Sequence, residues 1–529
     1  MADPLHWWQD AIIYQLLVPS FSDSNGDGYG DLQGVIQRLD YLQWLGVSAL
    51  WLSPVYPSPM ADLGYDISDY VNIGPAFGTL GDFEKLVDQA HQHDLKVILD
   101  WVPNHTSDEH PWFLESRSNR DHAKRDWYIW RDAKSDRSPP NNWISVFGGS
   151  VWEWDDHTDQ YYLHTFLSKQ PDLNWRNPDV RAAMFETLRF WLNKGVDGFR
   201  IDALDLLIKD EQFRDNPPNP DFQEGQGPDS QLLPHHTRDQ PGIHEVVASI
   251  RAVADEFGGD RMVAGELYLP VEKVVTYYGG EKPELHLPFH MQLAWTSWTA
   301  DKLCRSIGEY LAQVPTGGWP SWIISTHDCL RLAMRLQGEQ RRVAAMLLLT
   351  LLGTPVHYYG EEIGMKGVPI PGEHAVDPQG RRTGRNRDPE RTPMQWNTDH
   401  HAGFSTHEPW LPIAEDFHTA NVASQRDNPT SLLTLYRRLF ALRRERSTLT
   451  TGRLEIIAVQ GPLLAYQRVG NEENYMILLN FSSTPQTLKW DQTWAPQICL
   501  STFLDKNQER FHAPFEVRGD EGLILKLQS

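Results

Sequence analysis

Cysteine is scarce in this chain of 529 residues, which contains only Cys304, Cys329 and Cys499. Such an odd, sparse set does not form a disulfide framework and is typical of a reducing compartment. The first residues, MADPLH, contain no basic segment followed by an apolar run, so we expect no secretion signal and a cytoplasmic protein. The longest apolar run, around residues 343–352, is too short to span a bilayer and predicts a buried helix.

Positive charge is also in deficit, because 48 Lys and Arg face 71 Asp and Glu and leave a net charge of −23. An acidic surface repels nucleic-acid phosphates and anionic lipid heads, so we expect neither nucleic acid nor a membrane as partner. A small neutral ligand is not repelled. The 21 Trp residues would suit a ligand with flat C–H faces, although a Trp-rich core would give the same composition.

Short β-branched or aromatic runs alternate with amphipathic helical stretches along most of the chain. The predicted strands are 12–18, 49–53, 96–102, 198–203, 262–267, 285–291, 322–327 and 355–359, and predicted helices include 35–45, 82–93 and 432–443. Eight strands with intervening helices predict an α/β fold with a parallel sheet, and eight strands close a (β/α)₈ TIM barrel. An open doubly wound sheet is the alternative, but no Gly-rich phosphate-binding turn follows the first strand.

The alternation is interrupted twice. The connection between the third and fourth strands, from 104 to about 177, is too long for an ordinary loop and predicts an inserted small domain. From about residue 454 the pattern changes to short strands at 456–459, 464–468, 475–480 and 523–527, which predicts an antiparallel β domain. We therefore expect a barrel over 1–104 and 178–450, an inserted domain over 105–177 and a C-terminal β domain over 451–529.

Polar side chains follow the carboxyl ends of several predicted strands. These segments are 100–105 (DWVPNH), 198–203 (GFRIDA), 264–267 (AGEL) and 325–328 (STHD). In a TIM barrel these ends share one face, where catalysis takes place. One acid at a strand end is usually a helix cap, but Asp202, Glu266 and Asp328 lie on separate strands beside two imidazoles and a guanidinium. Burying so much charge together is costly without a function.

Two carboxylates placed across a bond are the minimum for cleaving a glycoside. One attacks the anomeric carbon or directs water, and the other protonates the leaving oxygen; a retaining pair is expected about 5–5.5 Å apart. A third carboxylate can hold sugar hydroxyls. His105 and His327 can donate to hydroxyls, and Arg200 would keep Asp202 ionised.

These four stretches resemble the signature regions of the α-amylase family of glycoside hydrolases. The first hundred or so residues and the segments 62–66 (DLGYD), 162–175, 353–364 (GTPVHYYGEEIG) and 387–396 (RDPERTPMQW) resemble its α-glucosidase and oligo-1,6-glucosidase branch. The resemblance covers essentially the whole chain. It implies a barrel with an inserted B domain after the third strand and a C-terminal antiparallel β domain.

The resemblance also implies residue roles. Asp202 matches the nucleophile, Glu266 the acid/base and Asp328 the transition-state stabiliser. The groups expected around the terminal glucose are Asp62, Tyr65, His105, Phe147, Phe166, Gln170, Arg200, His327 and Arg387. A competing interpretation places Phe147 and Phe166 in the core of the inserted domain. Thr326 stands where the family usually has Asn, which leaves the fine geometry near the glucose open.

The residue after the nucleophile bears on linkage. In this branch a Val there accompanies α-1,6 specificity, whereas smaller or polar residues accompany α-1,4 specificity. Ala203 therefore predicts a preference for short α-1,4-linked glucosides.

A second motif covers Asp23–Asp31 (DSNGDGYGD), with oxygen ligands at alternate positions around a Gly turn. It resembles the start of an EF-hand loop, but Gly34 occupies the position of the bidentate Glu and no EF-hand helix pair flanks it. The alternatives are a turn without metal and a stand-alone divalent site. The resemblance implies structural Ca²⁺ bound by Asp23, Asn25, Asp27, the Tyr29 carbonyl and Asp31.

The leading hypothesis is a retaining, exo-acting α-glucosidase that works through a covalent glucosyl-enzyme on Asp202. A sucrose hydrolase, a glucosyl transferase or a sucrose isomerase would share this intermediate. Isomaltulose-forming relatives carry an Arg/Asp-rich segment after the sixth strand, and residues 289–299 contain neither, which favours hydrolysis. A non-catalytic, transporter-associated protein is disfavoured because the three acids are present. The expected partner is a small oligosaccharide or α-glucoside, and the oligomeric state is left open.

Overall fold

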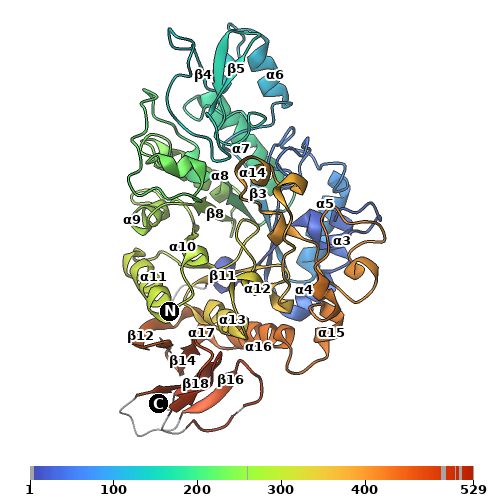
Figure 1. The fold of residues 1–529 in the computed structure, drawn as a ribbon, viewed down its shortest axis with the longest axis vertical. Coiled ribbons are helices and arrows are strands. Elements are labelled where there is room, and N and C mark those ends of the chain that lie inside the picture. Colours follow the sequence, from blue (N-terminus) through green and yellow to red (C-terminus); the bar gives the residue numbers. More distant parts are fainter. Residues whose placement is uncertain (1–4, 259, 490–495, 507, 512–514, 528–529) are drawn as a thin grey trace.

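The computed structural model describes residues 5–258, 260–489, 496–506, 508–511 and 515–527, so residues 1–4 and parts of the predicted C-terminal domain lie outside the description. Its centre is an eight-stranded parallel sheet in the order β10-β11-β1-β2-β3-β7-β8-β9 (Figure 1). The strands are β1 (Ile13–Leu16), β2 (Ala49–Leu52), β3 (Lys96–Trp101), β7 (Gly198–Ile201), β8 (Met262–Leu267), β9 (Leu287–His290), β10 (Ser321–Ile323) and β11 (Thr354–Tyr358).

The sheet closes into a nearly complete barrel. Its two end strands, β9 and β10, lie against each other, and the Ser321 hydroxyl donates to the Pro288 carbonyl at 2.9 Å. Side chains fill the interior, among them Ile13, Trp51 and Phe289, while neighbouring positions on the strands pack outwards against the helices. The predicted TIM barrel is confirmed, and the open doubly wound alternative is wrong.

The helices that surround the barrel follow the predicted alternation with local differences. They include α5 (Leu80–Gln92), α7 (Pro178–Asn193), α8 (Ile243–Asp255), α11 (Ala300–Gln313), α13 (Gln340–Thr350) and α16 (Leu432–Glu445). The apolar run near residue 343 lies in α13 and is buried from Val343 to Thr350, as predicted. No described helix combines the length and apolar character that crossing a bilayer requires.

Two local predictions were wrong. The single helix expected over 35–45 is a pair, α3 (Leu32–Ile36) and α4 (Leu39–Leu45), and α3 starts early because the Asp31 carboxylate caps it by accepting from the Gly34 amide. The first strand is shorter than expected, because the chain turns into the short helix α2 (Val18–Phe21), which has Pro19 in its first turn.

The chain between β3 and α7 forms the small unit at the top of Figure 1. It contains α6 (Pro111–Ser118) and a three-stranded antiparallel sheet of β4 (Trp130–Arg131), β6 (Gln160–Leu163) and β5 (Trp152–Asp155). A cluster around Trp143 and Trp152 gives it a core of its own. Its entry and exit lie side by side, because the Leu173 amide donates to the Asn104 carbonyl at 2.9 Å.

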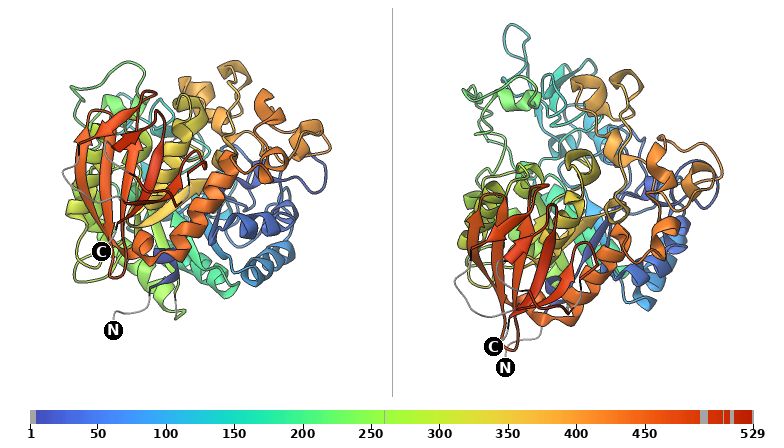
Figure 2. Two further views of the ribbon diagram at one scale, coloured as in Figure 1. Left: turned by 90° about the horizontal axis from the view of Figure 1, so that it is seen from below. Right: turned by 60° about the horizontal axis from the view of Figure 1, so that its bottom comes forward.

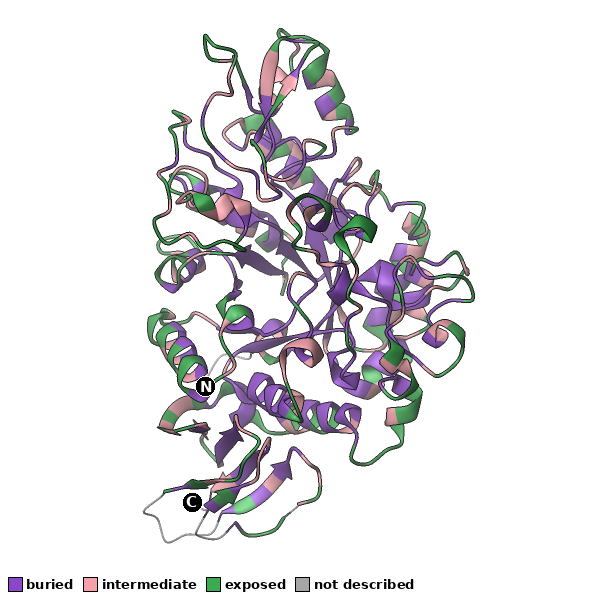
Figure 3. Cartoon of the chain, viewed as in Figure 1, coloured by how far each residue is buried: buried purple, intermediate pink, exposed green. Residues whose placement is uncertain are grey.

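The C-terminal region is antiparallel and lies at the end opposite the inserted unit (Figures 1 and 2). Its main sheet has the order β12-β13-β14-β18-β16, with bounds β12 (Arg453–Gln460), β13 (Leu463–Val469), β14 (Asn474–Asn480), β18 (Gly522–Leu527) and β16 (Gln497–Ser501). A further pair, β15 (Gln486–Leu488) and β17 (Phe515–Val517), was not predicted. Burial is continuous from the barrel strands through α13 and α16 towards this sheet (Figure 3).

Candidate active site

A cavity of about 350 Å³ opens at the carboxyl ends of the barrel strands. Ten of the predicted residues line it directly: Asp62, Tyr65, His105, Phe147, Phe166, Asp202, Glu266, His327, Asp328 and Arg387. The other two, Gln170 and Arg200, are buried and bonded to residues of this lining. The structure thus brings the whole predicted set together, although the role of each residue stays a prediction.

One guanidinium organises the floor of the cavity. Arg200 Nη1 lies 2.8 Å from Asp202 Oδ1, and its Nη2 lies 2.7 Å from Glu266 Oε1. Its Nη1 also lies 2.6 Å from Asp100 Oδ1 on β3. The neighbouring parallel strands β7 and β8 set this arrangement, since Ile201 pairs with Gly265 immediately before the two acids. The carboxylates of Asp202 and Glu266 are therefore held side by side.

The same cluster shifts the pKa values of both acids. Burial raises the pKa of Asp202 well above its ordinary value, and the nearby Glu266 and Asp100 carboxylates raise it further against the effect of Arg200. Burial also raises the pKa of Glu266. Arg200 lowers the pKa of Asp202, but its single positive charge is shared among three buried carboxylates, so it offsets the effect of burial only in part.

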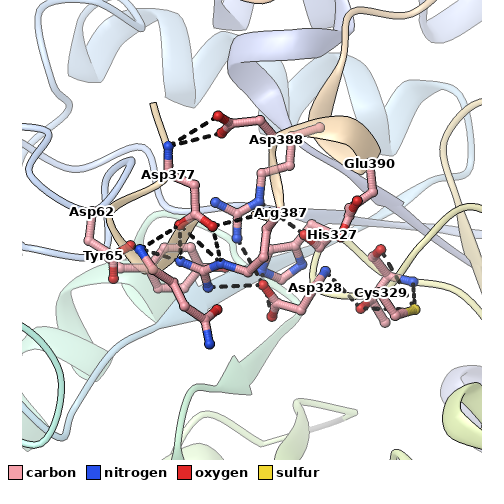
Figure 4. Close-up of polar contacts among 12 residues, drawn as sticks. Asp62, Tyr65, His327, Asp328, Cys329, Asp377, Arg387, Asp388 and Glu390 are labelled. Atoms are coloured by element: carbon pink, nitrogen blue, oxygen red, sulfur yellow. Dashed lines mark hydrogen bonds and ion pairs between the residues drawn. The ribbon is translucent and has the colours of Figure 1, made fainter. Parts of the chain in front are cut away.

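The opposite end of the cavity is closed by a second charged group (Figure 4). Arg387 Nη2 lies 3.2 Å from Asp62 Oδ1, and its Nη1 lies 3.1 Å from Asp328 Oδ1. Burial opposes ionisation of Asp328, but His327, Arg387 and Arg391 hold its pKa well below its usual range. Asp328 is therefore an ionised carboxylate at neutral pH.

The imidazole of His327 is neutral, and a hydrogen bond fixes its orientation. Burial lowers its pKa to about 3. The Gln15 amide donates to His327 Nδ1 at 2.7 Å, which leaves the proton on Nε2. That nitrogen lies 2.9 Å from the Tyr65 hydroxyl and 3.3 Å from Asp328 Oδ2, so it presents a donor at the cavity wall.

Side chains of the inserted unit complete the wall. The guanidinium of Arg387 packs over the Phe147 ring, with its central carbon 5.1 Å from the ring centre. The rings of Phe166 and His105 pack edge to face, with their centres 5.2 Å apart. Gln170 donates to Asp62 Oδ2 at 3.0 Å. Neither Phe belongs to the separate core of this unit, so the structure favours the cavity interpretation for both.

Thr326 has a local structural role. Its side chain is buried and does not line the cavity, and its hydroxyl accepts from the Asp328 amide at 3.1 Å. Thr326 therefore fixes the backbone turn that presents Asp328.

Several residues of the site were not predicted from the sequence. Asp377 is fully buried and accepts from Arg387 Nη2 at 2.7 Å and from the Arg387 amide at 2.8 Å. It lies in a long loop without periodic pattern, so no local signal identified it. Tyr268 follows Glu266 by two residues, and strand alternation was a usable signal for it. The remaining unpredicted lining residues are Val146, Leu206, Asp229, Ser230, Arg238, Trp295, Gln379 and Arg385.

The predicted calcium loop lies apart from this cavity. Its carboxylates already accept hydrogen bonds from the protein: Asp23 from the Gly26 and Gly28 amides and the Ser405 hydroxyl, Asp27 from the Tyr29 amide and Asp31 from the Gly34 amide. Within the described ranges, no group of three or more His, Cys, Asp or Glu is arranged to hold a metal. The loop does offer the hard oxygen donors that calcium prefers, and a carboxylate has about four lone-pair sites, so these bonds leave acceptor capacity. Calcium binding stays a prediction.

Comparison with known proteins gives a consistent picture. Residues 15–452 match the α-amylase catalytic domain. The chain is 40% identical over 499 residues to a probable α-glucosidase of Rhizobium meliloti (strain 1021), covering 91% of this chain and 90% of the relative. It is 38% identical over 518 residues to the oligo-1,6-glucosidase of Parageobacillus thermoglucosidasius, covering 90% of each.

Solved structures agree with these relatives. An α-glucosyl transfer enzyme superposes with a TM-score of 0.92 at 35% identity, covering 99% of this chain and 100% of that one. The trehalulose synthase of Pseudomonas mesoacidophila MX-45 superposes with a TM-score of 0.91 at 32% identity and the same coverage. With the barrel and the charged cavity at its strand ends, these matches show that the chain belongs to the α-amylase family of glycoside hydrolases.

Proposed function

We propose that this protein is a retaining, exo-acting α-glucosidase that releases the terminal non-reducing glucose from short α-1,4-linked glucosides. The observation that carries the proposal is the cavity floor, where one guanidinium holds Asp202 and Glu266 side by side. Relatives named α-glucosidase and oligo-1,6-glucosidase support the reaction class. Solved trehalulose synthase variants with bound glucose and isomaltulose support a small saccharide as the ligand.

The proposed reaction has two displacements. In the first, an Asp202 oxygen attacks the anomeric carbon while the Glu266 proton passes to the glycosidic oxygen; the C–O bond breaks and the aglycone leaves as an alcohol. In the second, Glu266 takes a proton from water, whose oxygen attacks the same carbon and releases the Asp202 carboxylate. Two inversions leave the glucose in the α configuration. The raised pKa of Glu266 suits the acid of the first step.

The groups around the floor fit a terminal glucose. Asp328 is ionised and His327 presents a donor, so together they offer an acceptor and a donor to neighbouring hydroxyls. Asp62 and Arg387 close the far end and leave no exit for a longer chain on that side. Charged hydrogen bonds of this kind strengthen as positive charge develops on the sugar in the transition state.

The test follows the anomer of the first product. Hydrolysis of maltose monitored by ¹H NMR should show α-glucose from the newly cleaved ring before mutarotation. Asp202→Asn should remove nearly all activity while the melting temperature stays close to that of the wild type. Asp221→Asn, at an exposed carboxylate outside the cavity, is the matched control. Appearance of the newly cleaved ring as β-glucose, beyond the anomeric mixture that the reducing-end ring of maltose always contributes, would refute the double displacement.

Transfer to a sugar acceptor is the second candidate, because the chain superposes on an α-glucosyl transfer enzyme and on a trehalulose synthase. Both reactions pass through the same proposed intermediate and differ in whether water or a hydroxyl attacks it. Incubation with maltose, isomaltose, sucrose and trehalose separately, with all products resolved over time, distinguishes them. Accumulation of new disaccharides in place of glucose would favour transfer.

The remaining elements of the proposal are structural calcium in the Asp23–Asp31 loop and a cytoplasmic location. The location rests on cysteine usage, since Cys304, Cys329 and Cys499 are all free thiols.

A further inference from the structure

Two large aromatic side chains stand exposed at the mouth of the cavity. Tyr268 is 40% exposed and Trp295 is 53% exposed. Tyr268 follows β8 directly, and Trp295 ends the short helix α10 (Gln292–Trp295) after β9. Exposed aromatic faces that flank a site frequently mark where a ligand binds.

Both residues also border a second depression outside the catalytic cavity. This outer groove has a volume of about 520 Å³ and runs between residues 267–272 and the helices α10 and α11. A shallower depression of about 330 Å³ continues from it along α10 and α11. Trp295 borders all three spaces, so it stands where the catalytic cavity meets the outer groove.

The groove offers polar groups opposite the indole. Gln292, Glu309 and Gln313 are exposed along it. In the described part of the chain, the Glu309 carboxylate has no ion pair, and the buried Ser306 hydroxyl in the adjoining depression has no hydrogen-bond partner. The Gln292 side-chain carbonyl accepts from His290 Nε2 at 3.0 Å and the Gln313 side chain donates to the Glu309 backbone carbonyl at 3.3 Å, so both amides keep further hydrogen-bonding capacity. A flat apolar face beside an exposed carboxylate and exposed amides matches a pyranose ring, which has a C–H face and a rim of hydroxyls.

We propose that the outer groove binds the second sugar of the aglycone, which is the third ring of a trisaccharide substrate, with Trp295 as its stacking platform. The inference rests on the proposed function. The closed end at Asp62 and Arg387 forces the rest of the substrate out through the mouth, and the mouth leads past Trp295. An uncharged saccharide is the occupant because the polar groups of the groove suit hydroxyls and the C–H face suits the indole.

The test compares kcat/KM for maltotriose with kcat/KM for maltose. Trp295→Ala should lower this ratio by about three- to tenfold, the range expected for losing one aromatic stacking contact. Glu309→Gln and Gln292→Ala should lower it less. Trp154→Ala, on strand β5 of the inserted unit and outside these spaces, should leave the ratio unchanged.

If Trp295→Ala leaves the ratio of the two kcat/KM values unchanged, the proposal is overturned. An unchanged ratio with kcat/KM lowered equally for both substrates would place Trp295 against the first aglycone ring. Calorimetric binding of maltotriose and maltose to Asp202→Asn tests the groove without turnover. If the wild type fails to hydrolyse either sugar, the proposed function fails. The proposed binding of a sugar in the outer groove is then tested by binding alone. It is supported if Trp295→Ala weakens maltotriose binding more than maltose binding, and refuted if it does not.

Discussion

At the scale of single residues, the protonation of the site depends on the ratio of positive charges to carboxylates. Arg200 is 1% exposed and contacts Asp100, Asp202 and Glu266. In a buried site of low dielectric, such a cluster favours retention of a proton. A carboxylic acid and a carboxylate on neighbouring strands are the two species that the proposed first step requires.

The pH dependence of activity should reflect this cluster. As the pH rises through the lower apparent pKa of the Asp202 and Glu266 pair, the pair loses one proton and the carboxylate nucleophile forms. Above the upper apparent pKa the second proton is lost, and the general acid is no longer present. Since burial raises the pKa of both groups, both limbs of kcat/KM should lie above the ordinary carboxyl values of about 4. Kinetics with a 4-nitrophenyl α-glucoside measure the limbs, and an acid limb at the ordinary Asp value would contradict the expectation.

Asp377 positions Arg387 without lining the cavity. The Asp377 carboxylate accepts from three nitrogens of Arg387, and the Asp388 carboxylate accepts from the Asp377 amide (Figure 4). Asp388 also accepts from the Val376 amide and so holds the loop. Without Asp377, the guanidinium would be drawn towards Asp62 and Asp328 and would compete with substrate hydroxyls.

Asp377→Asn should therefore raise KM for maltose by about tenfold, since a hydrogen bond to a charged group contributes roughly 1.5–3 kcal/mol, and should change kcat less. Steady-state kinetics measure the split. Asp377→Glu, which keeps the charge, should recover part of the affinity. Equal losses of kcat in both variants, with a lower melting temperature, would indicate a structural role only.

Ala203 combines a proposed specificity role with a left-handed backbone conformation. It adopts a left-handed conformation at φ 48° directly after the proposed nucleophile, and its amide lies 3.4 Å from Glu266 Oε2. Ala203→Val should narrow or reverse the preference for maltose over isomaltose. A β-branched residue is strained there, so the melting temperature should also fall, with a cost of about 1–2 kcal/mol.

The matched control is Ala203→Gly, because Gly tolerates a positive φ. It should keep the α-1,4 preference without loss of stability. An isomaltose preference in the wild type, or no change of preference in Ala203→Val, would contradict the role assigned to this position.

At the scale of elements, the inserted unit is attached to the barrel by buried charge. Lys209, in the segment after β7, lies 3.0 Å from Asp172 Oδ2, and its ammonium donates to the Asn104 side chain at 3.0 Å. These contacts join the two ends of the inserted segment to a barrel loop. They hold the wall that carries Phe147, Phe166 and Gln170 over the strand ends.

The Asp23–Asp31 loop is the element for which a metal is predicted. Calcium that binds only the folded state should raise the melting temperature, and a chelator should lower it, with little change in kcat because the loop lies outside the cavity. Asp27→Ala should abolish the response to calcium. Melting temperatures that are the same with calcium and with chelator would show that the hydrogen bonds from the protein to the loop carboxylates suffice.

At the scale of the whole molecule, the barrel, the inserted unit and the long loop before α16 jointly enclose the cavity. Residues from each contribute to the lining: Asp202 and Glu266 from the barrel, Phe166 from the inserted unit and Arg387 from the loop. Under the proposed function, a cavity closed at one end by Asp62 and Arg387 would admit only the end of a chain.

Starch should consequently be a poor substrate that is shortened only from its ends. Glucose should appear while the iodine colour of amylose persists, and maltose should be hydrolysed more efficiently per molecule. The measurement follows glucose release and iodine absorbance together. A rapid loss of iodine colour with mixed oligosaccharides would show mid-chain cleavage and contradict the closed cavity.

The sequence by itself determined the barrel, because hydrophobic periodicity and strand spacing are local patterns, and it identified Asp202, Glu266 and Asp328 because each stands at the end of a recognisable strand. Only the tertiary structure decided the contacts that join distant segments. Asp377 lies in a loop without a periodic pattern, and its role depends on its ion pair with Arg387, which is distant from the strand ends in sequence. The raised pKa of Asp202 depends on desolvation and on acids of other strands, which spacing does not encode. The outer groove beside Trp295 likewise exists only because the segment after β8 and the helices α10 and α11 pack around it.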